Sequence, residues 1–325
     1  MGFNAAILAD SVSTSGYRLV TMEATFPRLV LAEFNTHRVF SRNSASSRAI
    51  PVAKQLERVI KDPFVPAEFG ANRPGMQAGE RLSGDRHELA QEQWLLARDE
   101  AVLRALALIG GPEVLELAES SGPLAATELV GTLAKNHEIP ETWPNVHKQI
   151  TNRLLEPFMW HTVIVTATEW DNFWNLRTHP DAQPEIRRLA RLMKAQWLAS
   201  TPSTIDADGW HMPLVDDDEK EALGHDGDFL RKVCVGRCAR VSYLTHSGLR
   251  DHLADVQLHD RLIDGGHMSP FEHVARPIPS DVLRTSATDW SGNFRGWIAY
   301  RKDIPQEANP LARSPMGPAL VTMPI

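Results

Sequence analysis

Most of the side chains that could do chemistry fall in one short polar stretch, residues 35–48, which reads Asn-Thr-His-Arg-Val-Phe-Ser-Arg-Asn-Ser-Ala-Ser-Ser-Arg. The stretch holds three arginines, four serines, two asparagines and one histidine. A guanidinium binds phosphate in a planar, bidentate manner, and nearby hydroxyl and backbone N–H groups can satisfy the remaining oxygens. The stretch therefore predicts an anion-binding site, and a solvated Ser/Arg loop is the alternative.

The overall composition is that of a globular protein, with a charge that limits the possible partners. The chain has 325 residues, of which 42% are hydrophobic and 23% charged, so it is long enough to bury a large core. Its formal net charge of −7 argues against a general nucleic-acid coat, whose surface would be basic. A small anionic ligand held by a local arginine cluster is compatible with this charge.

Neither a targeting segment nor a metal site is expected. Residues 1–10 lack the basic start and the apolar length of a signal peptide, and no stretch approaches the roughly twenty apolar residues of a membrane span. Cys234 and Cys238 are too few for a disulfide framework, and a lone pair of cysteines is a poor zinc site. We expect buried thiols in a protein of the reducing cytoplasm.

The elements around the polar stretch position it at the end of a buried segment. Residues 17–26 alternate as in a strand, which Pro27 ends, and residues 29–34 predict a helix or turn that presents His37 and Arg38. Beyond Pro51, residues 52–60 predict a short amphipathic helix.

The rest of the chain predicts mostly helices, in a single domain spanning residues 1–325. Apolar spacing and Gly/Pro punctuation predict helices at 86–109, 113–120, 124–136, 143–157, 181–198 and 249–263. Residues 158–167 predict a strand or a buried helix start. Three segments predict irregular structure, namely the Pro/Gly-rich loop 61–85, the acidic loop 201–229 and the Pro-rich tail 305–325. Residues 290–302 interleave aromatic and basic side chains, which indicates either a ligand site or a packed edge.

The polar stretch resembles a signature of the flavin-dependent thymidylate synthases, which is written R-H-R, then seven residues, then S. Here His37-Arg38 is followed by seven residues and then by Ser46, with Arg48 two positions further on. A second block, residues 167–177 with 181–187, resembles the family's N-L-R and A-Q-x-E-I helix. Three separate blocks, counting the one described next, are hard to obtain by chance.

The third block stands in an unexpected place. Residues 237–243 and 266–273 carry the A-R-V-S and H-x-S-P-F-E-H patterns, which precede the arginine–histidine motif in the family but follow it here. We therefore interpret the chain as a circularly permuted, divergent relative. Permutation preserves a fold when the old termini lie close together and the new ones fall at an exposed edge.

The resemblance implies a fold, a reaction and partners. The fold is α+β, with an antiparallel or mixed sheet flanked by helices, assembled as a homotetramer with shared sites. The net charge and the lack of a long apolar stretch separately predict no nucleic-acid and no membrane contacts. The reaction is one-carbon transfer (methylation) to C5 of a pyrimidine deoxynucleotide, by default dUMP to dTMP. FAD is the cofactor, with NADPH and methylenetetrahydrofolate as co-substrates. The loop at 61–85 covers the substrate in the family, and here it could equally be a connector.

Site residues carry over by position. Flavin contacts fall on His37, Arg38, Val39, Asn172, Ser269 and Glu272. Nucleotide contacts fall on Glu33, Ser44, Ser46, Ser47, Arg48, Arg153 and Arg177. The expected catalytic residues are Arg177, Ser46 and His267. For the histidines a structural role, and for Arg153 a plain surface position, are the alternatives.

Departures from the family pattern leave the substrate open. Thr36 replaces the first arginine of R-H-R, Glu33 a glutamine, Ser44 a glutamate, Asp181 a histidine and Thr166 an asparagine. A carboxylate at Glu33 can accept from an exocyclic amine, which cytosine has and uracil lacks. The alternatives are therefore hydroxymethylation of dUMP or dCMP and, because one motif cation is lost, a non-catalytic flavin- or nucleotide-binding protein.

Overall fold

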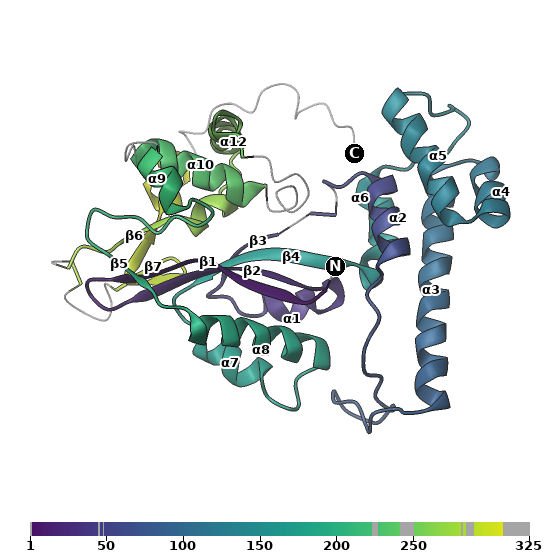
Figure 1. Cartoon of the computed structure of the whole chain (residues 1–325), viewed down its shortest axis with the longest axis horizontal. Helices are drawn as coiled ribbons and strands as arrows, with labels where there is room; N and C mark the ends of the chain where they lie inside the picture. Colours follow the sequence, from purple (N-terminus) through teal and green to yellow (C-terminus); the bar gives the residue numbers. More distant parts are fainter. Residues whose placement is uncertain are drawn as a thin grey trace.

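The computed structural model describes residues 2–44, 46–47, 49–222, 227–240, 250–280, 282–283 and 289–307. A five-stranded mixed sheet lies at its centre, in the order β3-β4-β2-β1-β5 (Figure 1). The pairs β1–β2, β2–β4 and β3–β4 are antiparallel, whereas β5 pairs with β1 in parallel. The strands are β1 (Asn4–Ser13), β2 (Arg18–Pro27), β3 (Ser41–Ser44), β4 (Trp160–Ala167) and β5 (Ser203–Ile205).

Helices cover both faces of the sheet, which confirms the expected α+β class (Figure 1). On one face lie α1 (Leu31–Asn35), α7 (Asp171–Arg177) and α8 (Pro184–Ala199). On the other lie α9 (Asp217–Ala222), α10 (Gly227–Ala239) and α12 (His252–Asp264). The central strands β2 and β4 are therefore buried on both sides.

Side-chain alternation in β4 shows how two cores share one strand. Val163 and Val165 pack into the core beneath the sheet, together with α8. Ile164 points the other way, into the core formed with α10 and η3 (Ser269–His273). Because successive strand residues face opposite sides, the apolar run predicted at 158–167 resolves as a strand buried on both faces.

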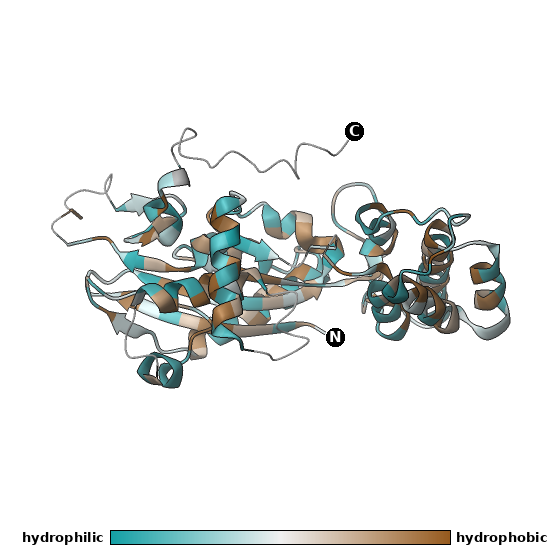
Figure 2. Cartoon of the chain, turned by 90° about the horizontal axis from the view of Figure 1, so that it is seen from above, coloured by the Kyte–Doolittle hydropathy of each residue, from teal (hydrophilic) through white to brown (hydrophobic). Residues whose placement is uncertain are grey.

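A group of helices around its own core forms one end of the elongated chain (Figure 2). Buried residues such as Leu56, Val102, Leu106, Val114 and Leu155 hold it together. Its members are α2 (Val52–Lys61), α3 (Asp85–Ile109), α4 (Pro112–Ser121), α5 (Pro123–Asn136), α6 (Lys148–Thr151) and the 3-10 helix η2 (Asn152–Phe158). The helix expected from residue 143 thus begins at Lys148, and most of it is 3-10.

Short elements complete the described chain after η3. β6 (Ala275–Pro277) pairs with β9 (Trp297–Ala299), and β7 (Trp290–Ser291) pairs with β8 (Phe294–Arg295). The 3-10 helices η4 (Tyr300–Asp303) and η5 (Pro305–Glu307) follow. The predicted tail beyond residue 307 lies outside the described residues, and in the described part no helix has the length and apolarity to cross a membrane.

The prediction of an acidic loop at 201–229 is wrong in part, because this segment contains β5, α9 and the start of α10. Asp216 and Glu219 stabilise the start of α9. The backbone N–H of each donates to the carboxylate of the other, at 3.4 Å and 2.9 Å, as in a capping box. The guanidinium of Arg237, whose side chain is 1% exposed, then donates twice to Glu219, at 2.6 Å and 2.7 Å. Sequence reasoning placed these charges in solvent because their buried partner lies on another helix.

We expect Glu219→Ala to lower the free energy of unfolding by about 3 kcal/mol, because it leaves the buried Arg237 without this partner. Urea unfolding measures the change. The control Asp217→Ala removes a neighbouring exposed carboxylate and should change stability by no more than about 0.5 kcal/mol.

Glu219 should also make the stability of the fold depend on pH. Hydrogen bonds from Arg237 lower the pKa of Glu219 from 4.5 to about 2. The stability that Glu219 contributes is therefore present above pH 4.5 and is lost as the pH falls through about 2. A Glu219→Ala variant with the wild-type acid unfolding profile and stability would contradict this assignment.

Candidate functional site

The centre of the candidate site is the contact between α1 and α7. Pro27 ends β2, and the short α1 turns the chain so that His37 comes to lie between aromatic rings. The imidazole sits edge-on to Phe173 at 4.8 Å and tilted against Phe40 at 5.6 Å between ring centroids. These rings bury His37, so the polar stretch begins in the core rather than in a solvated loop.

Arg177, the last residue of α7, closes the site over His37. Its Nε donates to His37 Nε2 at 3.0 Å, and its Nη2 donates to the Glu33 carbonyl at 3.2 Å and to Thr36 Oγ1 at 3.0 Å. Thr36 in turn donates its hydroxyl to the Glu33 carbonyl at 2.7 Å. Thr36 stands where the family motif has its first arginine. Its hydroxyl therefore helps to hold Arg177, whereas an arginine there would add a second cation.

His37 is uncharged in this arrangement. Burial first, and then the charges of Arg177 and Arg42, lower its pKa from 6.5 to about 4. Because a guanidinium can only donate, Nε2 must accept and the ring proton lies on Nδ1. The site thus presents a fixed cation beside a neutral imidazole.

The segment 267–273 lies next to the arginine–histidine motif, since η3 packs against β3. Glu272 receives a hydrogen bond from Arg301, whose Nε also donates to Glu307 at 2.5 Å. Arg42 of β3 is affected by both segments: burial and then the charge of Arg38 lower its pKa, and the charge of Glu272 offsets part of this effect. A cleft of about 210 Å³ opens here, and its lining includes Ser41, Glu272, Asn293, Phe294, Arg301 and Lys302.

A buried polar chain ties the same segment to the sheet. His273 Nδ1 lies 2.8 Å from Thr166 Oγ1, which lies 2.7 Å from Thr21 Oγ1. Thr21 Oγ1 lies 2.7 Å from His211 Nε2, and the other ring nitrogen of His211 lies 2.8 Å from Ser11 Oγ. Burial lowers the pKa of both histidines to about 3, so both are neutral. Of these five residues, sequence analysis singled out only Thr166, as a departure from the family's asparagine. His273 belonged to the third block but was given no role.

A second group of polar residues surrounds the end of the polar stretch. Asn152 is buried and donates to the backbone carbonyls of Ser47 and Ile50, at 2.7 Å and 3.0 Å. Glu156 accepts from Ser47 Oγ at 3.3 Å and pairs with Arg28 at 2.9 Å. These partners fix the loop, but neither Asn152 nor Glu156 has a motif that sequence reasoning could have used.

The sequence matches the profile of Thy1, described as thymidylate synthase complementing protein, over residues 17–203, which is more than half of the chain. The chain belongs to this family. Members of the Thy1 family are flavin-dependent thymidylate synthases. No match was found among curated proteins.

Two solved structures are similar to this Thy1 chain. Both are of a UMP/dUMP methylase PolB from Streptomyces cacaoi, one bound with 5-Br dUMP and the other with 5-Br UMP. The first has a TM-score of 0.39 and 16% identity and covers 60% of this chain and 89% of that chain. The second has a TM-score of 0.38 and 15% identity and covers 60% and 88%.

The Thy1 match includes the His37–Arg177 contact and the loop around Ser47 but ends before η3. Of the expected site residues, the structure brings His37, Arg177 and the backbone of Glu33 into one bonded group. It places Glu272 beside Arg42, with the exposed Ser269 in the same short helix. Val39 is half-buried against the core next to His37.

Other expected residues form no hydrogen bond or ion pair with this group within the described chain. Arg153 is exposed, with a long contact of 3.6 Å to Glu156. Exposed positions are also found for Arg38, Ser44, Ser46, Asn172 and His267, while Arg48, Val241, Ser242 and Tyr243 lie outside the described residues. Within the described chain, no hydrogen bond or ion pair joins His267 or the Ser47 group to Arg177. Cys234 and Cys238 are buried free thiols, as expected, and no metal-binding cluster occurs among the described residues.

The charge of Arg177 should be measurable at His37. We expect Arg177→Met to raise the pKa of His37 from about 4 toward 6.5, because it removes a neighbouring positive charge. NMR titration of ring-labelled histidine measures the pKa. The control Arg153→Met removes an exposed guanidinium and should leave the His37 titration unchanged; equal curves for wild type and Arg177→Met would contradict the contact.

Proposed function

We propose that the chain catalyses flavin-dependent transfer of one carbon from methylenetetrahydrofolate to C5 of a pyrimidine deoxynucleotide, with dUMP as the default substrate. Membership of the Thy1 family and the fixed Arg177–His37 pair support this proposal most directly. FAD, recharged by NADPH, would supply the electrons that reduce the transferred carbon to a methyl group.

Residues that would hold the flavin fit an anionic cofactor. Arg38 is exposed and makes no hydrogen bond or ion pair within the described chain, although it lies close enough to Arg42 to lower that group's pKa. A pyrophosphate would neutralise this repulsion. His37, with its Nδ1 proton, together with Ser269 and Glu272, would contact the ring system.

Arg177 would stabilise negative charge that develops on the pyrimidine. Three hydrogen bonds hold its Nε and Nη2, so the guanidinium needs little reorganisation when that charge forms. Nη1 donates to no group within the described chain and would point its hydrogens to the base. The phosphate would lie at the loop of Ser46, Ser47 and Arg48, with Arg153.

No hydrogen bond or ion pair joins these two groups within the described chain, and we propose that another subunit completes the site, as in the implied homotetramer. In a closed oligomer, the loop of one protomer can meet the α7 of its partner. The position of η3 beside β3 also supports circular permutation, because the third block reaches the motif from the C-terminal side of the chain.

The test is product analysis. Purified protein incubated with dUMP, methylenetetrahydrofolate, FAD and NADPH should yield a nucleotide that is one methylene heavier by mass spectrometry. A product heavier by CH2O, as when a hydroxymethyl group replaces the C5 hydrogen, would favour the hydroxymethylase alternative. Binding of flavin and nucleotide with no product from dUMP or dCMP would favour a non-catalytic binding protein, which the loss of the motif arginine at Thr36 also suggests.

Arg177→Ala should lower the rate of product formation about 10²–10³-fold, as expected for the loss of a preorganised charge stabiliser. Circular dichroism and the thermal midpoint should show a folded protein. The control Arg104→Ala removes an exposed guanidinium on α3 and should leave the rate unchanged. Wild-type turnover by Arg177→Ala would remove this residue from the mechanism.

One observation favours cytosine as a second candidate base. Oε2 of Glu33 is buried and has no hydrogen-bond partner within the described chain. A carboxylate can only accept, and the exocyclic amine of dCMP is a donor that dUMP lacks.

If Glu33 accepts a hydrogen bond from the exocyclic amine of the base, the wild type should prefer dCMP. Glu33→Gln should then shift the ratio of kcat/KM for dCMP to kcat/KM for dUMP toward dUMP by about tenfold or more. Competition between the two nucleotides in one reaction measures this ratio. The control Glu80→Gln changes an exposed carboxylate of the 61–85 loop, and an unchanged ratio in Glu33→Gln would exclude the reading of the base by Glu33.

A further inference from the structure

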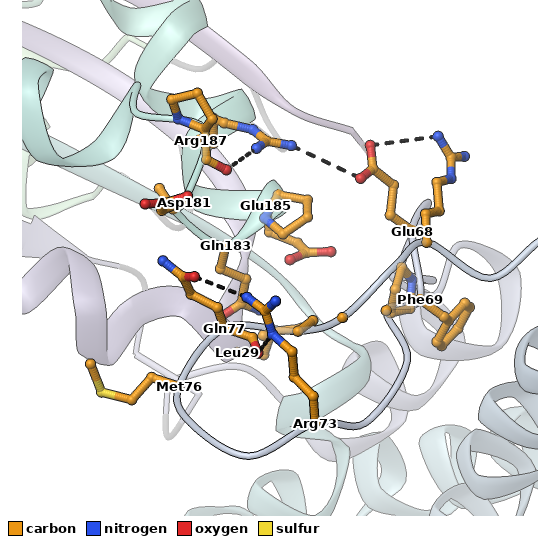
Figure 3. A pocket seen from close by; sticks show the side chains of 18 of the residues that line it. Leu29, Glu68, Phe69, Arg73, Met76, Gln77, Asp181, Gln183, Glu185 and Arg187 are labelled. Atoms are coloured by element: carbon orange, nitrogen blue, oxygen red, sulfur yellow. Dashed lines mark hydrogen bonds and ion pairs between the residues drawn. The ribbon is translucent and has the colours of Figure 1, made fainter.

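A second and larger cleft, of about 530 Å³, lies between the 66–81 loop and the turn that leads into α8 (Figure 3). It is large enough for a drug-sized or cofactor-sized ligand. Its lining combines the apolar side chains of Leu29, Phe69 and Trp94 with charged and amide groups. None of the contacts of the His37–Arg177 group involves it.

Both walls of this cleft are built by specific contacts. In the loop, Ala71 N–H donates to the Glu80 carbonyl at 2.8 Å, and Leu82 N–H donates to the Phe69 carbonyl at 2.7 Å. Gly70 allows this closure, since a Cβ there would lie 2.4 Å from that of Ala78. The 61–85 loop, for which a simple connector was the alternative, therefore folds into one wall of the cleft.

Glu185 is the notable side chain of the opposite wall. It is 6% exposed, lies in the first turn of α8 and points into the cleft (Figure 3). Within the described chain its carboxylate has no hydrogen bond and no ion pair. The helix N-terminus favours a negative charge there but leaves both oxygens without side-chain donors, so this largely covered carboxylate can accept hydrogen bonds from a ligand in the cleft.

Arg73 faces Glu185 from the loop. Its Nε and Nη2 donate to the backbone and side-chain oxygens of Gln77, each at 3.0 Å, which directs the guanidinium into the cleft (Figure 3). Arg73 and Glu185 form no ion pair with each other. A group that only accepts and a group that only donates thus face one another across open space.

We propose that this cleft binds a fused 2-amino-4-oxopyrimidine ring. Its ring N–H and amino group would donate to the two oxygens of Glu185, and its oxo oxygen would accept from Arg73, as guanine O6 accepts from arginine. Leu29, Phe69 and Trp94 supply apolar surface for the ring. The ring occurs in the pterin of a folate and in guanine nucleotides; the folate source rests on the proposed function, and the guanine source does not.

Isothermal titration of the full chain with 5-formyltetrahydrofolate, GMP and IMP tests the proposal, with neither flavin nor dUMP present. Either the folate or GMP should bind, which identifies the source. We expect Glu185→Gln to weaken that binding about 10–100-fold. If GMP binds, IMP, which lacks the amino group, should bind the wild type more weakly, and Glu185→Gln should reduce this difference. The control Glu80→Gln changes an exposed carboxylate outside the lining and should bind as the wild type does.

Binding of neither ring, or equal affinity for wild type and Glu185→Gln, would overturn the inference. If Glu185→Gln does not fold, as judged by its thermal midpoint, Arg73→Gln at the exposed loop replaces it, with the same expected loss. If the protein forms thymidylate but binds neither probe, only this inference is overturned. If it binds a probe through Glu185 but forms no product, only the proposed function is overturned.

Discussion

The hydrogen bond from Arg177 to His37 requires an uncharged imidazole, and the surrounding fold keeps it uncharged. Aromatic rings from α7 and from the start of the polar stretch remove water from His37, and two guanidiniums oppose its protonation. A charged ring could not accept from Arg177 and would repel it. The position of the cation at the end of α7 therefore depends on the aromatic rings that surround His37.

The second constraint is that β2 and β4 are buried on both faces, which leaves no solvent for polar side chains among them. Thr21 and Thr166 are satisfied by His211 and His273, which come from segments far along the chain. These bonds attach the C-terminal part of the chain to the part that matches the Thy1 profile. Glu272 reaches the arginine–histidine motif because its neighbour His273 is held in this way.

Sequence reasoning found what periodicity and motifs encode. The strand at 17–26, the helices on either side of the Pro/Gly-rich loop, and the proximity of His37 to Arg177 all follow from local spacing or from the family pattern. It failed where a partner is distant: Glu219 looked like a solvated charge because Arg237 lies on another helix, and Asn152 had no motif. The cleft around Glu185 was invisible for the same reason, since its two walls lie about one hundred residues apart.

The hydrogen bonds of the buried polar chain from His273 to Ser11 also have a preferred donor-to-acceptor direction. Each hydroxyl can donate only one hydrogen bond, and within the described chain the hydroxyls of Thr21 and Thr166 have no partner outside this polar chain. When each uses its proton inside the polar chain, all donors run in the same direction along it. His273 Nε2 has no partner within the described residues, and a bare lone pair is tolerated there more easily than an orphaned N–H. The favoured direction therefore starts at His273 Nδ1–H and ends with His211 Nδ1–H donating to Ser11. Reversing it would require every hydroxyl and both imidazoles to switch together, so the tautomers of His211 and His273 are set as one unit.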